Sequence, residues 1–134
     1  MHEALFWLYL ANATLLINHE IDSAYWREWN LFFPAKAEVT QASENRNMAF
    51  FLLAHLPLVC VILYGLVGVY NRTNAGLVIS LLLAAGGLFA FCAHMFFLRK
   101  GRQEFNTPLS LLVLIITLPV SLAQGICTAL LLFR

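Results

Sequence analysis

The chain has 134 residues, of which 61% are hydrophobic and only 11% are charged, and its formal net charge is +1. A soluble domain carries about 25% charged residues, and a charge balance this close to zero gives no support for a nucleic-acid partner. The apolar residues lie in long blocks, so the composition is typical of an integral membrane protein and not of a soluble core.

Four apolar blocks predict four transmembrane helices, at about residues 4–22, 48–70, 75–98 and 108–133. A helix needs about 20 apolar residues to cross a bilayer, and the last three blocks reach that length. The first block reaches it only if its helix continues through His19, Glu20 and Asp22. We therefore expect an all-α membrane protein, in which residues 1–134 form one transmembrane domain built as an up-down-up-down four-helix bundle.

Basic residues predict the orientation of this bundle. Four crossings would place both termini on one side of the membrane, and the other side would hold two larger segments, about residues 23–47 and 99–107. Those segments carry six of the eight basic residues, namely Arg27, Lys36, Arg46, Arg99, Lys100 and Arg102. Because basic residues favour the cytoplasm, we expect these segments there, the first as an interfacial segment, and both termini outside.

Four ionisable residues lie inside the predicted helices: His19, Glu20, His55 and His94. Such residues are costly in a membrane and are candidates for function. At a rise of 1.5 Å per residue, the imidazoles of His19, His94 and His55 lie roughly 5, 8 and 12 Å inside the cytoplasmic boundary. Three different helices thus place a histidine in the same half of the bilayer, and we expect the three to converge on one site.

Three imidazoles with a nearby carboxylate are a ligand set that suits zinc or iron. Asp22 stands three residues after His19 and shares its helix face. The predicted metal ligands are therefore His19, Asp22, His55 and His94. Glu20 or Glu28 would then serve as general base in a metal-dependent enzyme that acts on a lipid-phase substrate.

Other interpretations of the same residues stay open. The histidines could form a metal-free polar cluster that binds a lipid-soluble small molecule, relays protons or belongs to a transport module, or they could be independent structural residues. The chain could also be an accessory subunit of a larger membrane complex. In every case the lipid bilayer is the expected partner, and an oligomer is compatible with the pattern.

A second polar layer lies deeper in the predicted bundle. Asn12 and Gln124 are each roughly 14–15 Å from the outer boundary, close to the midplane. Amides at equal depth can pair across helices, so we expect these two side chains to face the interior together.

The stretch from Asn18 to Trp29 contains a His-Glu-x-Asp motif and a Glu-Trp pair, and His55-Leu56-Pro57 follows it. These features resemble an uncharacterised family, a domain of unknown function, of small bacterial four-helix membrane proteins. The resemblance covers most of the chain and implies a bacterial inner-membrane protein, but no activity. The stretch is also similar to the HXXEE membrane domain family, although here Asp22 and Ser23 stand where that motif has two glutamates.

Overall fold

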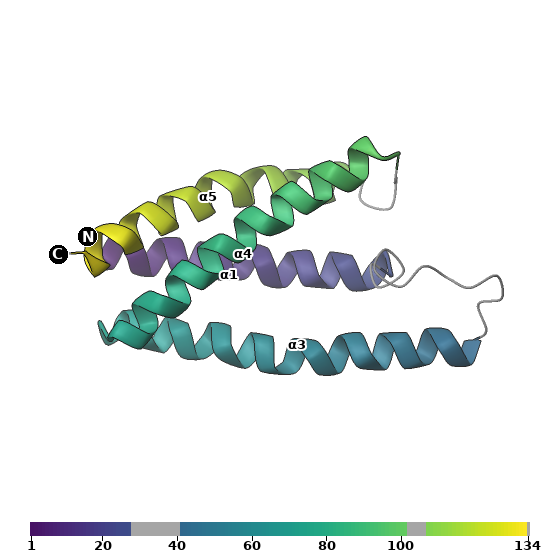
Figure 1. Ribbon diagram of the computed structural model, residues 1–134, viewed down its shortest axis with the longest axis horizontal. Coiled ribbons are helices and arrows are strands. Elements are labelled where there is room, and N and C mark those ends of the chain that lie inside the picture. Colours follow the sequence, from purple (N-terminus) through teal and green to yellow (C-terminus); the bar gives the residue numbers. More distant parts are fainter. Residues whose placement is uncertain (28–40, 102–106, 134) are drawn as a thin grey trace.

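The computed structural model describes residues 1–27, 41–101 and 107–133, and all the regular structure in these ranges is helical. The four helices are α1 (His2–Tyr25), α3 (Gln41–Tyr70), α4 (Asn74–Arg99) and α5 (Pro108–Leu132). The all-α class is therefore confirmed. The two termini lie at the same end of the molecule, as does the short turn between α3 and α4 (Figure 1).

Helix α3 begins before the predicted start at residue 48 because the polar residues ahead of its apolar block are also helical. Its first turn carries Glu44, where a negative charge faces the positive end of the helix dipole. The amide of Gln41 donates to Asn45 one turn later, at 3.0 Å, and Glu44 lies 3.6 Å from the guanidinium of Arg27 at the end of α1. Part of the predicted interfacial segment thus extends α3.

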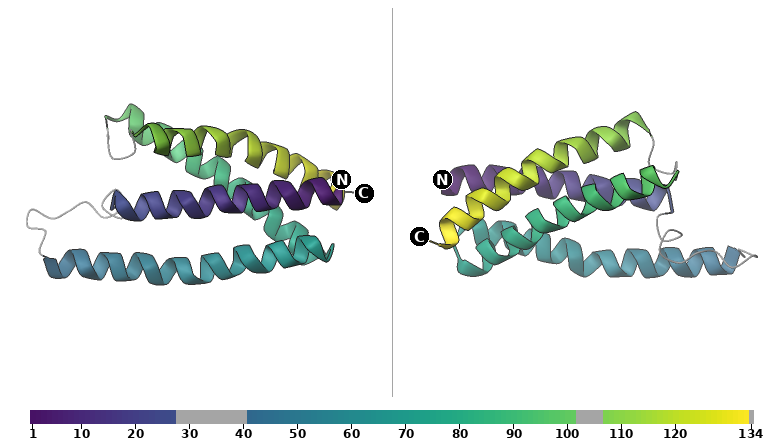
Figure 2. Two further views of the ribbon diagram at one scale, coloured as in Figure 1. Left: turned by 180° about the vertical axis from the view of Figure 1, so that it is seen from behind. Right: turned by 45° about the horizontal axis from the view of Figure 1, so that its top comes forward.

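Helix α1 lies between α3 and α5, and α4 crosses the molecule diagonally from the end of α3 towards α5 (Figures 1 and 2). Helix α1 packs most extensively against α5, and α4 also packs along α5. Helix α5 therefore packs against both α1 and α4, whereas α1 and α4 contact each other much less. Helix α3 is less closely held, because α4 diverges from it away from their shared turn.

Glycines fix α3 to α4 at that turn. The backbones of Gly68 and Gly76 are so close that a Cβ on either would meet the other residue's backbone. One turn earlier, Gly65 leaves room for the hydroxyl of Tyr9, which donates to the carbonyl oxygen of Ile62 at 2.8 Å. Small residues allow helices to approach in this way.

Only the last part of α3 is buried by the other helices. Its buried residues are Ile62, Gly65, Gly68 and Val69, so the turns before Ile62 contribute no fully buried residue. Helix α3 is therefore anchored at one end and stands apart from α4 at the other.

The interior of α1, α4 and α5 is held together by a polar network. The amide of Asn12 donates to Oε1 of Gln124 at 2.7 Å, and both side chains are fully buried. Ser121 donates to Oδ1 of Asn12 at 3.1 Å. Gln124 in turn donates to the carbonyl and hydroxyl oxygens of Ser80, each at 3.0 Å. The predicted pairing of Asn12 with Gln124 is thus confirmed, and the network that contains it links three helices.

Three of the helices, α3, α4 and α5, are long and apolar enough to cross a membrane. Helix α1 is not among them by composition, because its polar residues lower its hydropathy. It does continue through Glu20 and Asp22 to Tyr25, and its 24 residues span about 36 Å, more than the roughly 30 Å of a hydrocarbon core. The helix of the first predicted block therefore continues through His19, Glu20 and Asp22, as it must to be long enough to cross a bilayer.

Candidate ligand-binding crevice

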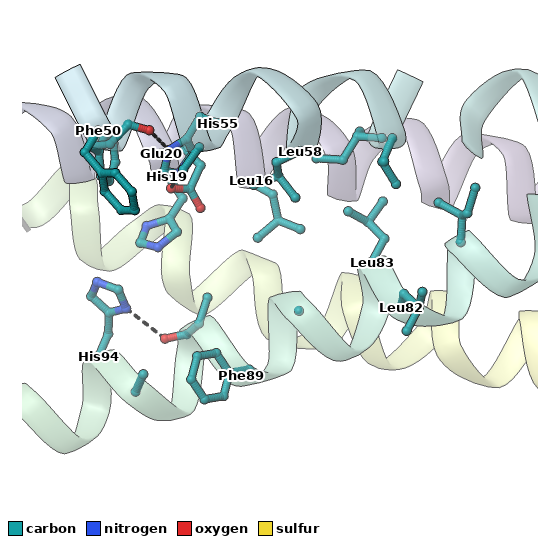
Figure 3. A pocket seen from close by; sticks show the side chains of 18 residues that line it. Leu16, His19, Glu20, Phe50, His55, Leu58, Leu82, Leu83, Phe89 and His94 are labelled. Atoms are coloured by element: carbon teal, nitrogen blue, oxygen red, sulfur yellow. Dashed lines mark hydrogen bonds and ion pairs between the residues drawn. The ribbon is translucent and has the colours of Figure 1, made fainter. Parts of the chain in front are cut away.

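A cavity of about 770 Å³ lies between α1, α3 and α4, where α3 stands apart from α4. We call it the crevice. Among the described residues that line it, all but four are apolar, and the exceptions are His19, Glu20, His55 and His94. Figure 3 shows these four side chains together at one end, with leucine side chains along the rest of the wall. The crevice is therefore an apolar space with one polar end.

The rim of the crevice is also apolar. Phe50 on α3 and Leu82 and Phe89 on α4 line it, and each is at least 64% exposed. A molecule that reaches the crevice from the side, between α3 and α4, therefore passes hydrophobic groups. Two adjacent glycines of α4 face different surroundings. Gly87 packs against Ser121 of α5, whereas Gly86 faces the crevice, where an added Cβ would meet nothing within 4 Å.

His55 and Glu20 form a pair that joins α3 to α1. Nε2 of His55 lies 2.7 Å from Oε2 of Glu20, and their side chains are 23% and 30% exposed. Nδ1 of the same ring lies 2.6 Å from the carbonyl oxygen of Phe51, one turn earlier on α3. A carbonyl oxygen only accepts hydrogen bonds, so Nδ1 must carry a proton. The pairing with Glu20 is therefore made through Nε2.

His19 and His94 form a second pair, from α1 and α4. Their ring centroids are 4.6 Å apart and the rings are nearly perpendicular, at 83°. Nδ1 of His94 donates to the carbonyl oxygen of Ala90 at 2.8 Å, which repeats the arrangement of His55 with Phe51. Both rings are buried, His19 being 6% and His94 2% exposed.

The structure thus brings His19, Glu20, His55 and His94 to one crevice from three helices. Asp22 is not among its lining residues, and Glu28 lies outside the described residues. Within residues 1–27, 41–101 and 107–133, no three His, Cys, Asp or Glu side chains form a group that could hold a metal ion. The zinc or iron site remains a prediction, and the four side chains are arranged as two pairs.

Sequence reasoning missed the apolar body of the crevice and the two backbone carbonyls that orient the histidines. One signal for the crevice was present. Glycines of α3 and α4 cluster beside their connecting turn, at Gly65, Gly68 and Gly76, whereas Phe50, Phe51 and Phe89 lie towards the other ends of the same helices. Small residues at one end and bulky ones at the other favour two helices that diverge.

Comparison with known families shows that the chain belongs to a family of unknown function, DUF6713, whose model matches residues 5–131. The similarity to the HXXEE membrane domain family remains a resemblance of the residues around His19. The search of curated proteins found no significant match, and neither did the search of solved structures.

Proposed function

We propose that this chain is an integral membrane protein whose crevice binds an amphipathic small molecule from the lipid phase. The membrane location is supported by the three long apolar helices and by the distribution of polarity. Large hydrophobic side chains such as Leu53, Tyr64 and Ile126 are exposed, whereas Asn12 and Gln124 are fully buried. Polar groups that face one another inside, with apolar groups outside, suit a lipid environment.

In this proposal α1 crosses the bilayer with the three more apolar helices. Both termini lie outside the cytoplasm, in the inner membrane of a bacterium, because most basic residues fall towards the opposite side. The polar end of the crevice then lies towards the cytoplasmic face and its apolar body reaches towards the midplane. The opening between α3 and α4 faces the acyl chains.

One observation carries the binding function: an apolar crevice has four ionisable side chains at one end. A space filled only by acyl chains needs no such groups, and placing them in a membrane is costly. A volume of about 770 Å³ is within the range of roughly 300–1,000 Å³ that is usual for small-molecule pockets. The ligand would lie along the leucine and phenylalanine wall and present its polar group to the histidines.

Gly86 provides a test because its position faces open space in the crevice. A long-chain alcohol that carries a photoreactive diazirine would be incorporated into nanodiscs with the full chain, and labelled peptides would be mapped by mass spectrometry. We expect labelling of crevice residues that Gly86→Leu abolishes by filling the cavity. Ala85→Leu, at the exposed neighbouring position, should leave the labelling unchanged. Equal labelling in both variants would refute the proposal.

A metal-dependent enzyme is the second candidate, and one observation favours it. His55 and His94 each hold Nδ1 against a backbone carbonyl, which is how many metal-ligating histidines are oriented. In this alternative, His55 and Glu20 would hold a zinc or iron ion, which would supply a Lewis acid and an activated water. Elemental analysis of purified protein, with His55→Ala as comparison, tests it: stoichiometric metal that the variant lacks would favour the enzyme.

A further inference from the structure

We infer that the first half of α3 is a gate, which swings about Pro57 to open the crevice to the membrane, and that His55 and Glu20 form its latch. The gate comprises residues 41–56 of α3. Its use, which is to admit a ligand, rests on the proposed binding function. Its movement does not, and it can be measured without any ligand.

The second half of α3 is fixed against two other helices. The hydroxyl of Tyr9 on α1 donates to the carbonyl oxygen of Ile62 at 2.8 Å. Gly65 has no room for a Cβ beside Ile79 of α4, and a Cβ on Gly68 would meet the backbone of α4. Contacts this close to the backbone leave little space for sliding or tilting, so movement of α3 is restricted to the turns before Ile62.

A proline lies between the fixed half and the gate. Pro57 stands inside α3, and because proline has no N–H, the carbonyl oxygen of Leu53 lacks the bond that residue 57 would donate in a regular helix. Sharp bends in helices occur mostly at prolines, and membrane helices tolerate them. Pro57 is therefore the position at which α3 bends most easily.

The gate is loosely packed and forms one wall of the crevice. None of residues 41–56 is buried, and Phe50, Phe51, Ala54 and His55 line the crevice. Acyl chains are as apolar as leucine, so apolar contacts between helices gain little over contacts with lipid. The gate can therefore exchange its apolar contacts for lipid at small cost, and this exchange widens the opening between α3 and α4.

Two polar contacts join the gate to α1 and define its closed position. Nε2 of His55 lies 2.7 Å from Oε2 of Glu20, and Glu44 lies 3.6 Å from Arg27. Arg27 is 65% exposed and exposed ion pairs contribute little, so we assign the latch to His55 and Glu20. The ring of His55 moves with the gate, because its Nδ1 is bonded to the carbonyl oxygen of Phe51. The contact with Glu20 crosses between helices and breaks when the gate opens.

A molecule in the crevice favours the closed position. It contacts the gate on one side and Leu82 and Leu83 of α4 on the other, and it makes both sets of contacts only while the two walls are close. A ligand shifts a conformational equilibrium towards the state that it binds better. The gate therefore opens more often when the crevice is empty and closes on the molecule that enters.

Distances between spin labels on the full chain in nanodiscs test the movement, in a background whose native cysteines are replaced by alanine. The gate pair is Arg46→Cys with Leu109→Cys, at exposed positions near the beginnings of α3 and α5. The control pair is Val67→Cys with Ile126→Cys, at exposed positions on the same two helices beside the fixed half of α3. We expect two distances for the gate pair and one for the control pair.

Two substitutions should shift the gate pair in opposite directions. His55→Leu removes the latch and should raise the ratio of open to closed at least about threefold, the factor that corresponds to one average hydrogen bond between membrane helices. Pro57→Ala restores the missing backbone bond and should leave only the closed distance. Glu20→Gln keeps a hydrogen bond to His55 and should behave like wild type. Hexadecanol, a long-chain alcohol of the kind proposed as ligand, should lower the open fraction of wild type.

A gate pair that is as narrowly distributed as the control pair, in wild type and in His55→Leu, would overturn the gate. An open fraction that persists in Pro57→Ala would overturn the hinge. Neither result alters the photolabelling of the crevice, so the binding function would stand. An open fraction that hexadecanol leaves unchanged while the crevice is labelled would show that the gate does not close on a ligand. Absence of crevice labelling in wild type would instead refute the binding function and the use of the gate, but not its movement.

Discussion

Replacing Gln124 by leucine should destabilise the protein by an amount that its hydrogen bonds determine. The side chain accepts from Asn12 and donates to two oxygens of Ser80. Bonds of this kind average about 0.6 kcal/mol in membranes, so those to the two residues together contribute about 1 kcal/mol. The substitution also leaves the buried amide of Asn12 and hydroxyl of Ser80 without this partner, which adds about 1–3 kcal/mol. We expect Gln124→Leu to lower the free energy of unfolding by about 2–4 kcal/mol.

A double-mutant cycle separates the pair from its surroundings. Asn12→Leu should cost about as much as Gln124→Leu, because it too leaves buried polar groups without a partner. The double variant should lose less than the sum, by about 1 kcal/mol or more, because neither amide then remains unsatisfied. Steric trapping in bicelles measures these free energies, with Thr14→Val, at an exposed position of α1, as control. Losses that add to within about 0.5 kcal/mol would show that the two amides are not coupled.

Three further predictions concern packing, orientation and metal binding. Gly87→Ala should lower the free energy of unfolding by about 1–3 kcal/mol because its methyl group meets a serine hydroxyl of α5; Gly86→Ala, with open space, should cost nothing and gain up to about 1 kcal/mol of helix propensity. A membrane-impermeant thiol reagent applied from outside should label Asn71→Cys and miss Lys100→Cys, with wild type as background; the reverse would invert the orientation. If zinc binds, its affinity should fall as pH falls, since protons compete for the ring of His55; an isotherm that is unchanged between neutral and acidic pH would exclude imidazole ligands.

The features that could be predicted from the sequence are those that depend on distance along a helix. Counting residues placed Asn12 and Gln124 at one depth, and the structure joins them at 2.7 Å. The same counting placed three histidines in one half of the bilayer, and all three line the crevice. Depth follows from the rise per residue, which is nearly constant, so it can be read before the helices are packed.

The start of α3 was not predictable from hydropathy, because the residues before Met48 are polar. Their helix is stabilised locally, by the bond between Gln41 and Asn45, and by the ion pair of Glu44 with Arg27 at the end of another helix. Hydropathy measures transfer to lipid and is insensitive to both contacts. A membrane-spanning block therefore gives the minimum extent of its helix.

The division of the histidines into two pairs could not be predicted either, because it depends on contacts between helices that residue types do not reveal. A common depth and three imidazoles favoured one cluster with Asp22. In the structure the ring of His55 turns to Glu20, which lies one residue beyond His19 on α1 and for which the sequence predicts the role of general base. The choice of partner depends on which face of α1 meets α3, and that depends on the rotation of each helix in the bundle.

The crevice and its polar end have a common origin in the position of the glycines. Gly68 and Gly76 hold α3 against α4 beside their turn, and α4 then crosses towards α5 (Figure 1). Away from the turn, the separation leaves His55 within reach of α1 and His94 within reach of His19, but on opposite walls. The divergence therefore produces the apolar space and divides the polar residues into two pairs, each bridging to α1. A substitution that brought α3 and α4 together along their whole length would close the space and change the pairing at the same time.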